Sequence, residues 1–152
     1  MKLRAIVFED NEALRTTISS MLEMRGYEVF SYSEPLLCPV YLDRECPHEH
    51  PCVDVSITDL RMPNMTGLDF IENQTRYGCK AIVSNKAVMS GAWTDEELER
   101  AKSLGCQIFE KPFGINEINK WLNECEERID PNRKLSDLPL SSKDDTGVTG
   151  AL

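Results

Sequence analysis

One short stretch of the chain, from Val53 to Gly67, constrains the fold more than any other. Apolar residues alternate at Val53, Val55 and Ile57, and the pattern runs directly into Asp59 and a loop that contains proline and glycine. This alternation predicts a short strand with an acidic residue at its carboxyl end. In an open α/β sheet that end is the edge where ligands bind, so Asp59 is the leading candidate for a reactive group.

Predicted strands and helices alternate along the rest of the chain. Four further apolar runs predict strands at residues 4–8, 27–31, 86–89 and 107–110. Apolar residues at helical spacing predict five helices, within residues 14–26, 35–42, 68–77, 94–105 and 115–128. Five strands that alternate with helices over short connections predict one α/β domain, with a parallel sheet covered by helices on both faces.

Length and charge exclude several classes of protein. The chain has 152 residues and a net charge of -9, which argues against direct binding of nucleic acid, because such surfaces need clustered lysine and arginine. The amino-terminal apolar run is too short for a signal peptide or a membrane span. We therefore expect a cytoplasmic protein without membrane insertion, in which the six cysteines are reduced thiols.

Polar residues follow four of the five predicted strands at the point where each strand ends. They are Glu9 and Asp10 after the first strand, Asp59 after the third, Ser90 after the fourth and Lys111 after the fifth. The carboxyl ends of parallel strands meet at one edge of the sheet, so these side chains are expected to lie in one site. Three carboxylates that converge repel one another unless a divalent cation lies among them.

Roughly residues 2–128 resemble the receiver domain of two-component response regulators, of the stand-alone type. The resemblance depends on four motifs in this order: Glu9-Asp10, Asp59 through Gly67, Met89-Ser90-Gly91 and Lys111-Pro112-Phe113. It implies a receiver domain at residues 1–128 and a doubly wound five-stranded parallel sheet of order 2-1-3-4-5, the flavodoxin-like or CheY-like fold. Residues 129–152 are polar and lack helical periodicity, so they are expected to form a disordered tail.

The resemblance also implies a role for each residue of the site. Asp59 is the phosphoacceptor, and Mg²⁺ is held by Asp10, Asp59 and the backbone carbonyl of Arg61, with Glu9 acting through water. Lys111 pairs with a phosphoryl oxygen, and its bond to the following proline is cis. The Ser90 hydroxyl moves to the phosphoryl group and shifts a two-state equilibrium.

The partners implied by the resemblance are a sensor histidine kinase or a phosphotransfer protein. No output domain is expected after Arg128, so the signal would pass to a downstream protein target or to self-association. The chain is expected to be a signalling domain that promotes its own phosphotransfer and dephosphorylation, rather than an enzyme.

Arg61 and Ala92 would border the phosphoryl group, and both favour slow self-dephosphorylation. Ala92 cannot orient a water, and Arg61 could lie over the phosphoryl oxygens.

Two departures from the family pattern stand out. Receivers usually carry an aromatic residue three positions before the lysine, whereas this chain has Ile108 there and Phe109 next, so the usual side-chain switch is in question. Thiols and imidazoles also crowd the segment before the third strand. Cys38, Cys46, His48, His50 and Cys52 match no standard metal-binding spacing, and a plain loop insertion is the favoured interpretation over a zinc or iron site.

Two alternative functions use related features. A haloacid dehalogenase-type phosphatase also has an aspartate nucleophile at a strand end, but it needs a second aspartate at the position that Arg61 occupies. A receiver-like interaction module that is not phosphorylated, or a thiol or metal sensor on the same fold, is the more serious alternative.

Overall fold

Five strands form one parallel sheet in the computed structural model, which describes residues 1–138. The strand order is β2-β1-β3-β4-β5, which confirms the predicted doubly wound fold. Each strand lies within one or two residues of its predicted position, and their bounds are β1 Leu3–Phe8, β2 Tyr27–Tyr32, β3 Val55–Asp59, β4 Lys86–Ser90 and β5 Gln107–Glu110. Asp59 pairs with Met89 at the carboxyl end of the central strands, so the polar residues that follow these strands share one edge.

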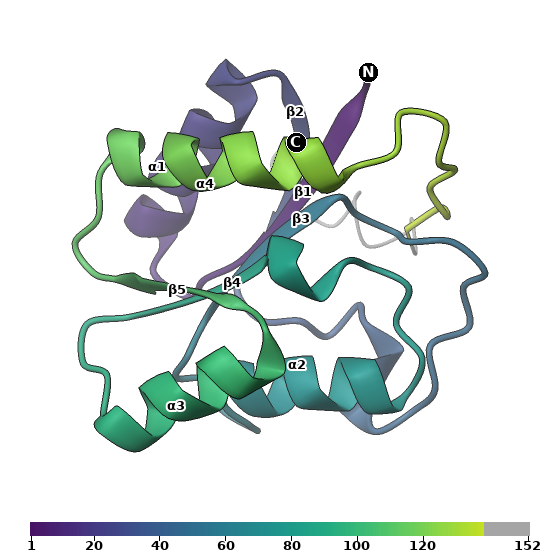
Figure 1. The fold of residues 1–152 in the computed structure, drawn as a ribbon. Helices are drawn as coiled ribbons and strands as arrows, with labels where there is room; N and C mark the ends of the chain where they lie inside the picture. The colour runs from purple at the N-terminus through teal and green to yellow at the C-terminus, as the bar shows by residue number, and fades with distance from the viewer. Residues whose placement is uncertain (139–152) are drawn as a thin grey trace.

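Two helices cover each face of the sheet (Figure 1). Helices α1 (Glu12–Met24) and α4 (Ile115–Arg128) pack on one face, and α2 (Gly67–Arg76) and α3 (Asp95–Leu104) cover the other. Successive strand residues point to opposite faces: Val7 packs with residues of α1 and α4, whereas Phe8 packs against Phe70 of α2. Within residues 1–138, no helix combines the length and the apolar composition that a membrane span requires.

The helix ends follow the local sequence. Thr66 and Thr94 each form a capping box with the residue three positions on, Asp69 and Glu97 respectively. Gly105 ends α3 with φ +86°, in the left-handed region that glycine adopts without strain. The two threonine caps fix where the chain leaves the loops after β3 and β4 and enters α2 and α3.

The prediction of a helix between the second and third strands was wrong. Only one turn of 3₁₀-helix forms there, η1 (Pro39–Leu42), and it ends at Asp43 in the left-handed conformation. Prolines at 35 and 39 lack the backbone N–H that a longer helix requires, which explains the short element. Residues 1–138 therefore hold four α-helices instead of five, and a second turn, η2 (Val83–Asn85), precedes β4.

Residues 129–138 pack against the domain, which differs from the expectation that the tail is disordered from residue 129. Arg133 forms two short bonds to the buried carboxylate of Asp54, at 2.8 and 2.6 Å. The Ser136 amide donates to the Pro51 carbonyl, and Leu138 is 7% exposed in the apolar cluster under α2. The segment lies beside the loop that precedes β3 (Figure 1). Residues 139–152 lie outside the described part of the chain.

Candidate functional site

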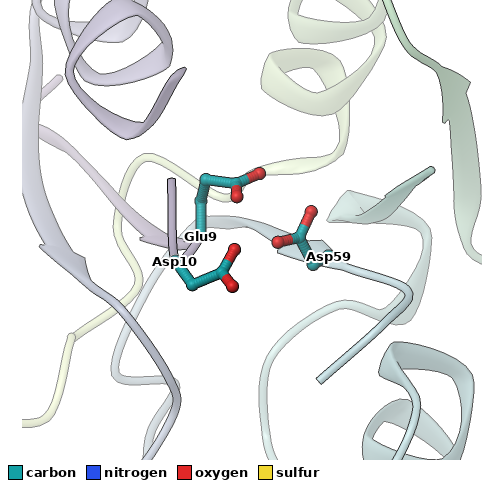
Figure 2. Close-up of side chains that lie close together, drawn as sticks. All are labelled: Glu9, Asp10 and Asp59. Atoms are coloured by element: carbon teal, nitrogen blue, oxygen red, sulfur yellow. The ribbon is translucent and has the colours of Figure 1, made fainter. Parts of the chain in front are cut away.

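Three carboxylates converge at the carboxyl edge of the sheet, as the sequence predicted. Glu9 and Asp10 directly follow β1, and Asp59 is the last residue of β3. One carboxylate oxygen from each residue lies within 4.8 Å of the others, and Figure 2 shows the side chains directed toward a common space. Within residues 1–138 this is the one group of three or more acidic, histidine or cysteine side chains close enough to hold a metal ion.

Lys111 joins two of these carboxylates. Its ammonium Nζ donates to Oδ1 of Asp59 at 2.8 Å and to Oε1 of Glu9 at 3.0 Å. The Lys111 amide donates to the Ser90 carbonyl at 2.8 Å, which anchors the backbone of this residue beside the end of β4. The bond to Pro112 is cis, as the resemblance implied. Four residues at the carboxyl ends of strands β1, β3 and β5 thus meet in one charged cluster.

Burial makes the charges in this cluster unequal. The Asp59 side chain is 8% exposed, and burial together with the adjacent Glu9 carboxylate raises its pKa to about 7, against the opposing effect of Lys111. Burial also disfavours the Glu9 charge, but hydrogen bonds from Asp59, the Asn11 amide and Lys111 outweigh it and lower the pKa of Glu9. Burial alone would lower the pKa of Lys111, but its hydrogen bonds to Asp59 and Glu9 outweigh this effect and raise the pKa. The site therefore holds three carboxylates, and the single positive charge of Lys111 does not fully compensate them.

The loop after β3 passes close to the site because of Gly67. A Cβ atom at this position would collide with the carbonyl oxygen of Asp59. The loop is closed by two backbone bonds, from Leu60 to the Met89 carbonyl and from Gly67 to the Leu60 carbonyl, both at 2.8 Å. Glycine is thus required for close backbone approach, a role that the sequence alone showed only as loop punctuation.

Ser90 lies at the end of β4, and its hydroxyl bonds to the local backbone. The hydroxyl donates to the Ala92 carbonyl at 3.0 Å and accepts from the Ala92 amide at 3.1 Å. The same carbonyl accepts a bond from Arg61, whose guanidinium also pairs with Glu97 of α3 at 2.8 Å. Arg61 therefore ties the β3 loop to α3, and it is not free to lie over Asp59 in this conformation. Glu97 was not among the site residues predicted from the sequence.

The aromatic residue near the end of β5 is part of the core. Phe109 is 5% exposed, stacks on Phe113 with ring centroids 4.9 Å apart and meets Trp121 edge-on at 5.5 Å. Its carbonyl accepts a bond from the Trp93 indole at 3.1 Å. Ile108 points to the opposite face and packs among residues of α2 and α3. The aromatic side chain is thus displaced by one position and, because of strand alternation, to the other face of the sheet.

The cysteine- and histidine-rich segment forms no comparable metal group. Among residues 1–138 its thiols and imidazoles do not gather in threes at ligand distance, and all six cysteines are free. The Cys46 amide donates to the Tyr77 carbonyl at 2.9 Å, which fastens the insertion to the end of α2.

A doubly wound sheet with this acidic cluster and lysine at its carboxyl edge defines the receiver class. Residues 5–123 match the model of the response regulator receiver domain, and the chain belongs to this family. The transcriptional regulatory protein FixJ of Azorhizobium caulinodans is 30% identical over 108 residues, which are 70% of this chain and 47% of that protein. The chain thus spans about half the length of this curated relative.

Solved structures show the same fold at low sequence identity. The chemotaxis protein CheY4 of Vibrio cholerae superposes with a TM-score of 0.61 at 22% identity, over 82% of this chain and 99% of that one. The receiver domain of sensor histidine kinase PA1611 from Pseudomonas aeruginosa, which has a magnesium ion coordinated in its active site cleft, gives a TM-score of 0.62 at 18% identity, over 82% of this chain and 97% of that one.

Proposed function

We propose that this domain is a phosphoacceptor receiver in which Asp59 takes a phosphoryl group from a sensor histidine kinase or a phosphotransfer protein. The observation that carries the proposal is the buried Asp59 carboxylate, held 2.8 Å from Lys111 and beside two further acids. An Asp59 oxygen attacks phosphorus, the bond from phosphorus to the donor nitrogen breaks, and an aspartyl phosphate forms.

The residues of the acidic cluster fit Mg²⁺. Magnesium prefers oxygen ligands, which Asp10, Asp59 and the Arg61 carbonyl would supply, with Glu9 acting through water. The raised pKa of Asp59 supports this assignment, because it reports carboxylate charge that lacks sufficient compensation. When bound, the ion would neutralise charge on the transferring phosphoryl group and favour the ionised form of Asp59.

Two side chains of the site would then change partners. Lys111 would exchange its bond to the Asp59 carboxylate for one to a phosphoryl oxygen, retaining a charged acceptor. The Ser90 hydroxyl would leave the Ala92 carbonyl and donate to the phosphoryl group. Because Arg61 bonds to the same carbonyl, this movement would affect the tie between the β3 loop and α3. The changed surface would signal to a downstream protein target or drive self-association.

Intact mass measurement tests the proposal. The full chain, incubated with a small phosphodonor such as acetyl phosphate and Mg²⁺, should gain one phosphoryl mass, and Asp59→Asn should abolish this gain. Asp43→Asn, a substitution at an exposed aspartate away from the site, is the matched control and should be phosphorylated normally. Absence of any gain in the wild-type protein would favour the alternative, a receiver-like interaction module or a thiol sensor that is not phosphorylated.

A further inference from the structure

A small cavity lies beneath the cysteine-rich insertion, on the α2 face of the sheet. It has a volume of about 40 Å³, and four thiols line it, from Cys38, Cys46, Cys52 and Cys79. All four are partly exposed, so small solutes can reach them. A space of this size accommodates a few heavy atoms, which excludes most organic ligands and admits water or a peroxide.

A buried lysine reaches into this cavity. Lys86, the first residue of β4, is 2% exposed, and its ammonium donates to Oε1 of Gln74 at 2.7 Å and to Sγ of Cys79 at 3.4 Å. In the part of the chain that the structure describes, no carboxylate lies within ion-pair distance of this ammonium. A buried cation without a counterion is costly, and the Cys79 thiolate is the anion that would relieve the cost. An adjacent ammonium is also what makes a cysteine reactive.

Two of the other thiols are suited to a second role. Burial and the nearby Cys79 thiolate raise the pKa of Cys38, and the same two effects raise that of Cys52 to about 12. A raised pKa makes both thiols poor first nucleophiles. Both side chains line the same cavity as Cys79, which makes them its candidate disulfide partners.

We propose that this cavity is a site of oxidative thiol modification, in which Cys79 reacts with hydrogen peroxide or a small organic hydroperoxide. The Cys79 sulfur attacks one peroxide oxygen, the O–O bond breaks, and water (or an alcohol) leaves as the sulfur becomes a sulfenic acid. The thiol of Cys38 or Cys52 then attacks this sulfur, an S–S bond forms, and a second water leaves. In total two thiols are oxidised to one disulfide, and one peroxide is reduced.

The disulfide would join the end of α2 to the insertion before β3. Cys79 lies three residues after the end of α2 at Arg76, whereas Cys38 and Cys52 lie at opposite ends of the insertion. The reaction does not involve Asp59, so it is independent of the proposed phosphorylation. Oxidation and phosphorylation can therefore be measured separately on the same protein.

Peptide mass mapping after limited oxidation tests the proposal. The reduced full chain is treated with a small excess of hydrogen peroxide, trapped with dimedone and an alkylating agent, and then digested. Cys79 should be modified first and should appear in a disulfide with Cys38 or Cys52. Cys106, which is also partly exposed but has no hydrogen bond from a lysine, is the internal control and should stay reduced. If Cys79 is oxidised no faster than Cys106 in the wild-type protein, the proposal is wrong.

Two lysine substitutions test the role of the ammonium. Lys86→Met removes the charge beside Cys79 and should slow its oxidation about ten-fold. Lys80→Met removes a lysine whose Nζ bonds instead to the Gly78 carbonyl, so it should leave the rate unchanged. Equal slowing in both variants, or none in Lys86→Met, would contradict the mechanism.

Discussion

The ammonium of Lys111 lies 2.8 Å from Oδ1 of Asp59, and this contact joins the end of β5 to the acidic site. The Asp59 side chain is 8% exposed and that of Lys111 28%, so water screens the pair only partly. The lysine thus offsets part of the negative charge of the site.

Removing this lysine should destabilise the metal-free protein. In Lys111→Met the Glu9 and Asp59 carboxylates lose their shared cation, which should lower the free energy of unfolding at pH 8 by roughly 1–3 kcal/mol. Urea denaturation with a chelator present measures the change. Lys120→Met, at an exposed position of α4, is the control and should be near neutral. An equal effect of the two variants would show that the Lys111 contact contributes nothing specific.

Stability should also depend on the charge of Asp59. Its pKa is raised from 3.8 to about 7 in the folded, metal-free protein, so the folded state holds the proton more tightly than the unfolded state does. The contribution of Asp59 to stability is therefore lost as pH rises through this range. Asp59→Asn removes the charge with little change of shape, and it should stabilise the protein by roughly 1–2 kcal/mol more at pH 8 than at pH 5.

Thermal or urea unfolding at the two pH values, in chelator, provides the measurement. Asp43→Asn, at an exposed aspartate, serves as the control for general charge effects. If Asp59→Asn stabilises the protein equally at both pH values, the stabilisation does not come from removal of the Asp59 charge.

The segment after α4 should be required for full stability. A chain that ends at residue 128 leaves the Asp54 carboxylate buried without its Arg133 partner, and we expect a loss of roughly 3 kcal/mol relative to the full chain. A chain that ends at residue 138 keeps Arg133 and Leu138 and should unfold near the full-length midpoint. Identical midpoints for the two truncations would support the sequence-based expectation that residues 129–152 form a disordered tail.

The lifetime of a phosphorylated form should depend on the residues that border the site. Ala92 offers no side-chain group to orient a hydrolytic water, so Ala92→Glu should speed loss of the phosphoryl group by about ten-fold or more. The double variant Arg61→Asn with Ala92→Glu should also decay faster than wild type. Since Arg61 pairs with Glu97 in this structure, the single variant Arg61→Asn tests whether the guanidinium leaves that partner on phosphorylation. Decay in the wild type as fast as in the double variant would contradict the expectation.

The fold and the acidic cluster could be predicted because they depend on local patterns. Alternating apolar residues set β3 and β1, and the carboxyl ends of parallel strands bring Glu9 and Asp59 to the same edge wherever such a sheet forms. Helix caps at Thr66 and Thr94 have equally local signatures.

Features that depend on distant contacts could not be predicted. Nothing near Arg133 in the sequence indicates that its partner is Asp54, 79 positions earlier. Lys86 was placed at the start of a strand, but its burial beside Cys79 follows only from the packing of α2 on the sheet. The wrong prediction of a helix at residues 35–42 has a local cause. The apolar spacing of this segment was given more weight than its prolines.

Chemical reduction of the phosphorylated protein tests the central claim most directly. Borohydride converts an aspartyl phosphate, but not a free aspartate, into homoserine, so peptide sequencing by mass spectrometry identifies the acceptor. After treatment with acetyl phosphate and Mg²⁺, the account predicts homoserine at position 59 alone, and none when a chelator replaces the metal. Homoserine at another position, or none at 59 in protein that has gained a phosphoryl mass, would contradict the assignment of Asp59 as the phosphoacceptor.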